Sequence, residues 1–484
     1  MDRQIALQET YGHFIGGQWV EPANHQYFEG VDPSTGNKIA SFARGNKEDI
    51  ERAVRSSEEG FQAWYGLKPS ARGQILNRVA QLLRKYKQDF AYMETIDTGR
   101  PLVFSASLVE TSARYFEYLG GAADKIFGEV IPASNEHLTY TYREPYGITG
   151  HITPWNVPIT QAARGAASAL AAGNSVVMKP AEQACLSTLE LAKLCVEAGM
   201  PPGTFNVVTG YGEEAGAPLI NHPAVRKIAF TGSVETGQIV MRAAADRIVP
   251  VSLELGGKSP NIVFDDADLH PAAAGSLRAF TFNTGQVCSA GTRLIVQRSI
   301  LPAFVEQLIE EAQQIKIGYG IDNPTIGPLV CEEQLHRVLR YVEIGKQEGA
   351  RLVYGGSRMQ EEKLKDGYFM QPTIFTDVTN TMTIAREEIF GPVVVVIPFD
   401  TEEEAIRLAN DTEFGLAAAV WTENIHRGHR VAKQLQAGQV YINDYSPIDV
   451  EAPFGGYKKS GIGREKGLES LHTYTQVKAI SVKL

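Results

Sequence analysis

Apolar positions follow two different periods along the chain. In Ile75–Tyr86 they recur three and four residues apart with basic residues between them, which predicts an amphipathic helix. Leu102–Phe127 also predicts a helix, and Asn46 followed by two acidic residues is typical of a helix start. The first third is therefore predicted to be mainly helical, until apolar and polar residues alternate in His137–Tyr142 and indicate a strand.

From Gly147 onward, short apolar segments alternate with amphipathic ones. Gly199, with prolines directly beyond it, is a helix stop signal. Alternation of strands and helices at this spacing implies a parallel sheet covered by helices. The expected strands are Ser175–Met178, Asn206–Val208, Lys227–Phe230 and Val251–Leu255, and the expected helices are Ala184–Ala198, Glu213–Ile220 and Ser233–Ala245.

A second strand–helix series follows a glycine-rich segment at Gly256–Lys258, where we place a domain boundary. Near the C-terminus, Val477–Val482 alternates and predicts one added strand. The length of 484 residues is consistent with about three compact units. The second series comprises expected strands at Asn261–Phe264, Leu294–Gln297, Val393–Pro398, Ala417–Trp421 and Gln439–Ile442.

Composition narrows the class of protein. Hydrophobic residues at 43% and charged residues at 21% exclude a disordered chain, a collagen and a coiled-coil rod. The net charge of -10 argues against a nucleic-acid partner, which requires clustered cations. The N-terminus has no apolar signal region, and the aliphatic run Val393–Ile397 is far shorter than the ~20 residues of a membrane span. The four cysteines form no C-x-x-C pair. We therefore expect a cytoplasmic protein with no membrane partner and no metal site.

Two segments could bind a nucleotide. Phe230–Ser233 (FTGS) places a glycine turn between a strand and a helix, where backbone N–H groups can hold a phosphate. A tight turn that binds no ligand is equally consistent with this sequence. Neither common nucleotide-binding motif, G-x-G-x-x-G or G-x-x-x-x-G-K-[ST], is present. Lys179 and Glu182 follow a strand end, where they could contact a ribose, although Glu182 could equally cap the next helix.

Three residues could carry catalysis. Prolines fix the backbone around Asn156, whose amide is either an oxyanion donor or a turn residue. Glu254 ends an apolar strand, either as a helix-cap partner or as a desolvated base with a raised pKa. Cys288 lies in a stretch rich in Gly, Ser and Thr, which we place at a loop-to-helix junction where backbone dipoles favour the thiolate. A buried thiol without chemistry is the alternative, and it is the interpretation for the remaining cysteines, Cys185, Cys195 and Cys331.

Taken together and in this order, the motifs PWN, FTGS, LELGGK, GQVC, EEIFGP and PFGGYK resemble the aldehyde dehydrogenase superfamily, in its non-acylating type, from about Phe14 to the C-terminus. The resemblance implies an α/β fold with two Rossmann-like parallel-sheet domains and a small β oligomerisation element. By likeness, residues 1–122 and 146–256 form the cofactor domain and residues 257–460 the catalytic domain. Residues 123–145 and 461–484 would form the bridging element, and a homodimer or homotetramer is expected.

The resemblance also implies a mechanism. The Cys288 thiolate attacks the aldehyde carbon while the Asn156 amide and the Cys288 backbone N–H hold the oxyanion. Hydride passes to a nicotinamide, a thioester remains, and Glu254 activates the water that releases the carboxylic acid. The expected cofactor is NAD, with NADP possible, because the Glu182 carboxylate accepts from a ribose hydroxyl and repels a 2′-phosphate.

Cofactor roles carry over by likeness onto matching positions. Thr153, Pro154 and Trp155 would line the ribose and nicotinamide side, Lys179 and Glu182 the adenosine ribose, Gly212 and Gly216 the adenine, Gly232 and Ser233 the pyrophosphate, and Leu255, Glu388 and Phe390 the nicotinamide half.

One position departs from the family pattern. Many relatives have Lys where this chain has Gly165, and that Lys can pair with an acid matching Glu465. Arg164 stands one residue earlier and either orients a polar substrate tail or forms the ion pair with Glu465. With Arg164, the expected substrate pocket comprises Val287, Ser289, Tyr445, Ile448 and Phe454.

An apolar, aromatic pocket with one cation favours an aromatic or medium-size hydrophobic aldehyde, or a semialdehyde. Two other functions stay open: an acylating enzyme that passes the acyl group to coenzyme A, and a catalytically silent scaffold protein.

Overall fold

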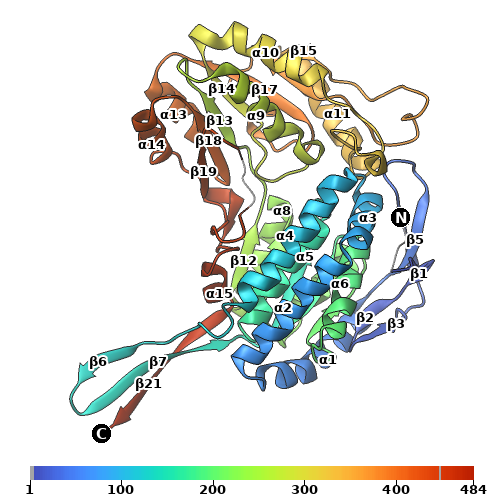
Figure 1. Ribbon diagram of the computed structural model, residues 1–484, viewed down its shortest axis with the longest axis vertical. Helices are drawn as coiled ribbons and strands as arrows, with labels where there is room; N and C mark the ends of the chain where they lie inside the picture. Colours follow the sequence, from blue (N-terminus) through green and yellow to red (C-terminus); the bar gives the residue numbers. More distant parts are fainter. Residues whose placement is uncertain (1–4, 446–448) are drawn as a thin grey trace.

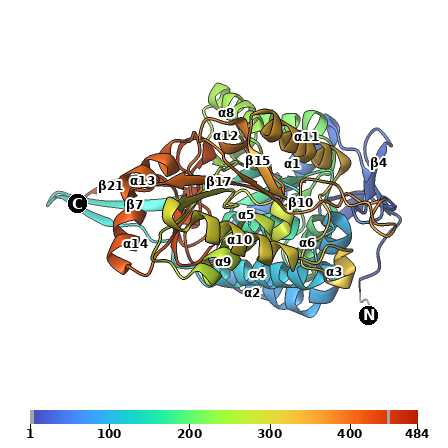
Figure 2. The same ribbon diagram turned by 90° about the horizontal axis from the view of Figure 1, so that it is seen from above.

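The chain folds into two lobes and a protruding arm. The computed structural model describes residues 5–445 and 449–484. Figure 1 shows the lobe built from the first half of the chain below the lobe built mainly from residues 260–445, with the arm extending away from both. In the view of Figure 2 the arm and the C-terminus project to the side opposite the N-terminus. No helix within these residues is long and apolar enough to cross a membrane.

An eight-stranded sheet forms the centre of the first lobe. Its five inner strands run parallel, as the strand–helix alternation predicts, and its edge strands run antiparallel. The strand order is β20(Gly461–Ile462), β12(Val251–Glu254), β11(Val225–Thr231), β8(Ile148–Thr153), β9(Ser175–Pro180), β10(Phe205–Val207), β2(His13–Ile15) and β3(Gln18–Val20).

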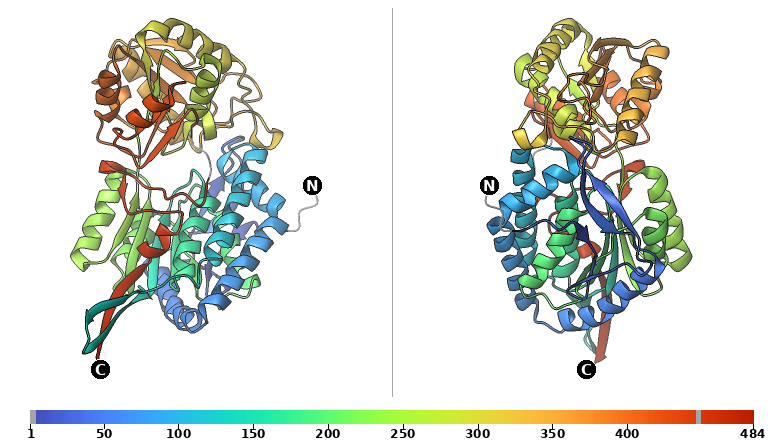
Figure 3. Two further views of the ribbon diagram at one scale, coloured as in Figure 1. Left: turned by 60° about the vertical axis from the view of Figure 1, so that its left-hand side comes forward. Right: turned by 90° about the vertical axis from the view of Figure 1, so that its right-hand side faces the viewer.

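Helices cover both faces of this sheet because its strands are apolar on both sides. On β9, Val176 and Met178 join one core cluster while Val177 joins the other. Helices α2–α6 cover the first face, and α1, α7 and α8 contribute to the second (Figure 3). The bounds are α1(Lys47–Tyr65), α2(Pro69–Lys85), α3(Lys87–Thr98), α4(Leu102–Gly120), α5(Pro158–Ala171), α6(Leu186–Glu197), α7(Ala217–Asn221) after a π-helical turn η1(Gly212–Gly216), and α8(Val234–Arg247).

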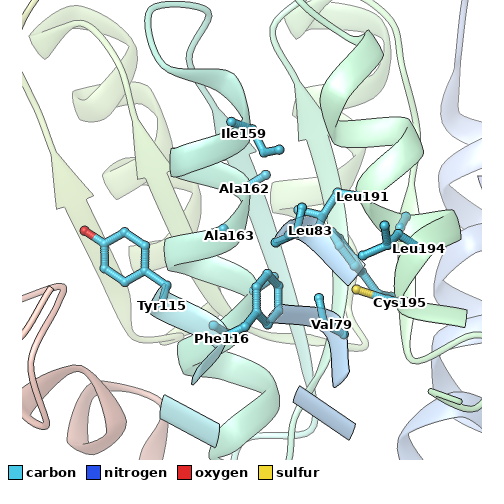
Figure 4. Packing of buried hydrophobic residues seen from close by; sticks show 14 of the residues in the cluster. Val79, Leu83, Tyr115, Phe116, Ile159, Ala162, Ala163, Leu191, Leu194 and Cys195 are labelled. Carbon is cyan, nitrogen blue, oxygen red and sulfur yellow. The ribbon is translucent and has the colours of Figure 1, made fainter. Parts of the chain in front are cut away.

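Helix α5 is the central helix of the first face and is buried along its whole length. Its small residues let α2, α4 and α6 approach closely. Side chains from all four helices belong to one hydrophobic core, part of which is drawn in Figure 4. Cys195 of α6 is one of them, which confirms its interpretation as a core thiol. The labelled residues are Val79, Leu83, Tyr115, Phe116, Ile159, Ala162, Ala163, Leu191, Leu194 and Cys195.

Two features of the first third differ from the sequence prediction. Before the first predicted helix the chain forms five short strands that the sequence analysis did not predict. They are β2, β3 and a separate three-stranded sheet of β1(Thr10–Tyr11), β5(Lys38–Ala43) and β4(Tyr27–Val31). Helix α4 ends at Gly120, short of the predicted Phe127, where Gly120 packs closely against α2. A Cβ on Gly73 of α2 would lie 2.4 Å from the Gly120 carbonyl oxygen.

The second lobe repeats the layered plan with a seven-stranded sheet that is parallel except at the β15–β16 edge. Along β17, Val393, Val395 and Ile397 face the cluster with α11–α14, and the intervening valines face α9 and α10. The strand order is β15(Arg351–Tyr354), β16(Thr373–Thr376), β17(Val393–Phe399), β14(Arg293–Gln297), β13(Pro260–Val263), β18(Ala417–Trp421) and β19(Gln439–Ile442). The helices are α9(Leu269–Thr281), α10(Leu301–Gln313), α11(Glu332–Gln347), α12(Thr383–Arg386), α13(Glu402–Asn410) and α14(Ile425–Ala432).

The arm is a three-stranded antiparallel sheet made from two distant parts of the chain. Its strands are β6(Val130–Ser134), β7(His137–Pro145) and β21(Thr475–Lys483), which follows the short helix α15(Glu469–Thr473). β21 pairs with β7 along its full length, from Thr475 opposite Pro145 to Lys483 opposite His137. All of β6 is exposed, including Val130 at 73%.

Candidate active site

Cys288 lies in a turn of the second lobe, after α9 and before β14. No helix begins there, so the predicted loop-to-helix junction is wrong. The residues before it form the 3-10 turn η2(Phe282–Gly285), in which Asn283 and Thr284 adopt left-handed conformations with φ of 51° and 56°. A Cβ on Gly257 would lie 2.4 Å from the Cys288 carbonyl oxygen, so the LELGGK segment packs directly against the nucleophile turn.

The environment of Cys288 favours the thiol rather than the thiolate. Burial raises its pKa to about 12, against a lowering contribution from the Arg164 guanidinium. The prediction that backbone dipoles favour the thiolate of Cys288 is therefore wrong, because no helix begins at this residue to supply those dipoles. Ionisation needs a base.

Asn156 is tied to the nucleophile turn by its side chain. It follows β8 and precedes α5, and its amide Nδ2 donates to the Gln286 carbonyl at 2.9 Å. The side chain is buried, with the residue 5% exposed. A primary amide carries two N–H donors, so one remains for another acceptor near Cys288.

Glu254 ends β12 and is 3% exposed. Neither carboxylate oxygen has a hydrogen-bond partner among the residues that the structure describes. Burial, reinforced by the charge of Glu465, raises the pKa of Glu254 well above its usual value, while Arg164 lowers it. The interpretation as a helix-cap partner is therefore wrong, and a desolvated carboxylate beside Gly455 is what the structure shows.

Arg164 forms a buried ion pair with Glu465 through its Nε. Its guanidinium lies 5.3 Å from the Phe454 ring centre, and the Lys466 ammonium lies 4.9 Å from the same ring centre. Of the two interpretations of Arg164, the structure contains the ion pair. The space that a side chain at Gly165 would need is taken by His151, whose Nδ1 would lie 2.9 Å from an added Cβ.

Of the remaining residues predicted for the substrate pocket, Tyr445 contacts the turn that carries Cys288. The Tyr445 hydroxyl donates to the Ser289 carbonyl at 2.7 Å and so braces the residue after the nucleophile. Val287 is half-buried, and Phe454 is buried between the two cations. Ile448 lies outside the described residues.

The predicted cofactor residues gather at the ends of β8, β9 and β11 and at the start of α8. Lys179 Nζ lies 3.2 Å from Glu182 Oε2, and no cap bond joins Glu182 to α6. Ser233 caps α8 by accepting from the Thr236 N–H at 3.2 Å. A side chain would fit poorly at Gly232, where an added Cβ would lie 2.5 Å from the Phe230 ring.

On the opposite side, the residues predicted to contact a nicotinamide come together. The ring of Trp155 meets that of Phe390 edge-on at 5.2 Å. Glu388 accepts from the Gly257 N–H at 3.1 Å, and burial raises its pKa to about 7. Leu255 is buried and bonds through its N–H to the Ser460 carbonyl at 2.9 Å. Thr153 ends β8 and Pro154 follows it.

The two glycines predicted to flank an adenine leave room around their Cα atoms. Nothing lies within 4 Å of a Cβ added at Gly212, and at Gly216 the nearest atoms are at 3.4 Å or more. Among the first N–H groups of α8, that of Thr236 donates to the Ser233 hydroxyl, whereas those of Val234 and Glu235 have no acceptor within the helix and can bind an anion. The donor and acceptor set thus suits a nucleotide cofactor with a pyrophosphate and a diol ribose.

Sequence reasoning missed the residues that hold the site together. Arg100 and Asn283 both donate to the Asn156 backbone carbonyl, and Gln286 links the turn to Val330. Their partners lie 44 to 127 residues away in sequence, so no local pattern reports them.

Comparison with known proteins identifies the family. The model of the aldehyde dehydrogenase family matches residues 19–480. The DhaS protein of Bacillus subtilis (strain 168) is 43% identical over 482 residues, covering 99% of this chain and 97% of that protein.

Solved structures agree. An aldehyde dehydrogenase from Bacillus cereus, solved as an NAD+ complex, is 44% identical with a TM-score of 0.96 and covers 98% of this chain and 97% of its own. Betaine aldehyde dehydrogenase from Staphylococcus aureus, also solved with NAD+, is 41% identical with a TM-score of 0.96, over 98% of this chain and 95% of its own. The predicted family and α/β fold are confirmed, and the chain belongs to the aldehyde dehydrogenase family.

Proposed function

We propose that this protein oxidises an aldehyde to the carboxylic acid with NAD, through a covalent adduct on Cys288 and hydrolysis assisted by Glu254. The observation that carries the proposal is the buried Glu254 carboxylate, which has no hydrogen-bond partner among the described residues and whose charge acts on the Cys288 thiol. A buried charge without a partner is costly, so a fold retains it where chemistry needs it.

NAD is supported by the two solved relatives that hold it and by the donor set around Lys179, Glu182 and the start of α8. When bound, NAD supplies the acceptor for the hydrogen and electron pair that the aldehyde carbon loses. Glu182 would accept from a ribose hydroxyl, and the N–H groups after Ser233 would bind the pyrophosphate.

The first step is nucleophilic attack. Glu254 takes the Cys288 proton, and the sulfur forms a bond to the aldehyde carbon as the carbonyl electron pair moves to oxygen. That oxygen accepts from the free Asn156 N–H and from the Cys288 backbone N–H. Loss of one such donor lowers kcat by about 10²–10³-fold.

The second step releases the product. Once the carbon is oxidised and Glu254 has released the Cys288 proton to solvent, water attacks the thioester on Cys288 while the Glu254 carboxylate accepts a water proton. The C–S bond breaks, its electron pair returns to sulfur, and the carboxylic acid leaves.

Two alternatives remain open as outcomes of the test. An acylating enzyme would pass the acyl group to coenzyme A instead of water, and a silent scaffold would turn over nothing. The retained Glu254 favours water as the acceptor.

The substrate proposal rests on the pocket. Phe454, Tyr445 and Val287 give it apolar and aromatic walls. We therefore propose an aromatic or medium-size hydrophobic aldehyde, with a semialdehyde as the alternative. Since Arg164 is paired with Glu465, a second anionic group on the substrate has less to gain from it.

The test follows NADH absorbance with purified protein and a panel of benzaldehydes, aliphatic aldehydes and semialdehydes, each with and without coenzyme A. Cys288→Ala should abolish turnover, whereas Cys331→Ala, which changes another half-buried cysteine, should retain it. Turnover that requires coenzyme A would move the protein to the acylating class. Turnover that survives Cys288→Ala would overturn the proposal.

We also propose the domain limits given by the resemblance and an oligomer assembled through the arm. Exposed apolar residues on all three arm strands, among them Val130, Leu138 and Val477, support it, because a lone sheet edge of this kind is normally covered by a partner. The mass of the assembly, measured by sedimentation, distinguishes a homodimer from a homotetramer.

A further inference from the structure

A buried ion pair on α3 and the turn after it holds the loop that carries Asn156 from both sides. The two charges are Glu94, in α3, and Arg100, two residues beyond its end. Glu94 is 0% exposed and Arg100 2%. Their charged ends face each other, with Arg100 Nη1 3.5 Å from Glu94 Oε2. Removing two charges from water is costly, so this pair is an expensive feature of the fold.

One end of the pair caps helix α5. The residue before α5, Val157, offers no capping side chain. Glu94 Oε1 accepts instead from the Ile159 N–H at 3.0 Å and from the Ser187 hydroxyl of α6. A carboxylate at a helix N-terminus satisfies an orphan N–H and interacts favourably with the helix dipole. Glu94 thus supplies from another helix the cap that the local sequence lacks.

The other end of the pair holds the Asn156 peptide. Arg100 Nη2 donates to the Asn156 backbone carbonyl, and Arg100 Nε donates to the Thr98 hydroxyl at 2.9 Å. Asn283, from the nucleophile turn, donates to the same carbonyl at 2.9 Å. The Asn156 carbonyl accepts two hydrogen bonds and the start of the next helix is capped, so the peptide plane is held in one orientation. In that orientation the side-chain amide donates to the carbonyl of Gln286, two residues before Cys288.

We infer that Arg100, charge-balanced by Glu94, is a positioning residue for the oxyanion donor Asn156. This inference rests on the proposed function, in which Asn156 is an oxyanion donor. Arg100 itself contacts neither substrate nor cofactor in this proposal. A misplacement of about 1 Å at a reacting group costs on the order of 10²-fold in rate. Arg100→Met should therefore lower kcat/KM for the aldehyde by about 10–100-fold per folded site.

A double-mutant cycle separates positioning from general stability. The four proteins are the parent, Arg100→Met, Asn156→Ala and the double variant, with rates counted per NADH-binding site. If Arg100 acts through Asn156, its substitution should cost less than about twofold once Asn156 is already Ala, because the two losses share one interaction. Arg72→Met is the matched control: Arg72 is also buried, at 5%, and donates to a backbone carbonyl, that of Leu67. Its effect should be the same factor in both backgrounds.

If Arg100→Met lowered kcat/KM by the same factor in the parent and in Asn156→Ala, or lowered it in neither, the inference would be overturned and the proposed function would stand. If Asn156→Ala alone retained full kcat/KM, both would fail. Should Arg100→Met prove too unstable, the cycle is run with Arg100→Lys, which keeps the charge opposite Glu94 but lacks the planar fork. The same criterion applies: a loss confined to the Asn156 background supports the inference, and an equal factor overturns it.

Discussion

At the scale of single residues, burial disfavours the reactive, charged form of both the candidate nucleophile and the candidate base. Burial raises the pKa of Cys288 to about 12 and raises that of Glu254 well above its usual value. The reactive forms are the thiolate and the carboxylate, and both become more abundant as pH rises. Arg164 is the cation that moves both pKa values back down.

This gives a pH prediction. The kcat/KM for the aldehyde should rise from acid toward alkaline pH, since each raised pKa must be approached before its group ionises. Arg164→Met should move the rising limb to higher pH, because a stabilising positive charge is lost. Rates measured across pH with Arg278→Met as a surface control would test it; a rising limb that stays in place, or moves to lower pH, would contradict the role of Arg164.

The Arg164–Glu465 pair also predicts stability. Arg164→Met leaves Glu465 buried beside Glu254 without its counter-charge, which should cost about 3–5 kcal/mol. Changing both partners, to Met and Gln, should recover most of that loss. Urea unfolding of the single and double variants measures it, and equal stability of Arg164→Met and the parent would show that the pair does not act as a unit.

Glu182 gives a prediction about cofactor choice. Its carboxylate beside Lys179 would repel a 2′-phosphate, so Glu182→Gln should improve kcat/KM with NADP relative to NAD by roughly 5–10-fold. The control is Glu190→Gln, which changes an acid in α6, the helix that follows Glu182; Glu190 pairs with Lys193. A cofactor ratio unchanged in Glu182→Gln, or changed as much in the control, would place the ribose elsewhere.

Residue identities at the candidate site were predictable where a short motif carries them, as for Asn156, Glu254 and Cys288. Their environments were not. The surroundings of Glu254 include Gly455, about 200 residues later in the chain, and that Cys288 precedes a strand rather than a helix depends on where α9 ends.

At the scale of elements, the strand–helix alternation and the helix caps were predicted well, whereas the short N-terminal strands were not predicted. β19 has the predicted bounds, Gln439–Ile442, and Asn46 caps α1 as expected. The N-terminal strands β1–β5 are two to six residues long. Segments that short carry too little pattern, and their pairing is decided by partners such as β10 far along the chain.

The cap of α1 predicts a measurable loss. The Asn46 side chain accepts from the N–H groups of Glu48 and Asp49, and Asp49 bonds back to the Asn46 N–H at 3.1 Å. Asn46→Ala should cost about 1 kcal/mol of stability, and Asn46→Ser much less, since serine also caps. Urea unfolding should rank the parent and Ser variant above the Ala variant; equal values for Ser and Ala would remove the cap as the cause.

At the scale of the whole molecule, the arm predicts assembly. Val477→Glu combined with Val482→Glu places charges on β21 where the side chains are 58% and 46% exposed. If these faces are buried between copies, the oligomer should dissociate, because an unpaired charge at an interface core costs several kcal/mol. Sedimentation would show a smaller species. Lys478→Glu and Lys483→Glu on the same strand serve as charged-residue controls, and an unchanged mass for the Val variant would exclude the arm as the contact.

The pairing of β21 with β7 sets an order of events during synthesis. Thr475 pairs with Pro145, and these residues are 475 − 145 = 330 positions apart. A ribosome adding about 5–20 residues each second therefore leaves β7 waiting roughly 20–60 seconds for its neighbour. During that interval one edge of β7 is unpaired in the nascent chain, and a strand of a second nascent chain on the same messenger could pair with it. Because β21 is synthesised last, two copies should assemble through the arm only when both chains are nearly complete. Premature pairing between copies would be detected as nascent chains associated on polysomes.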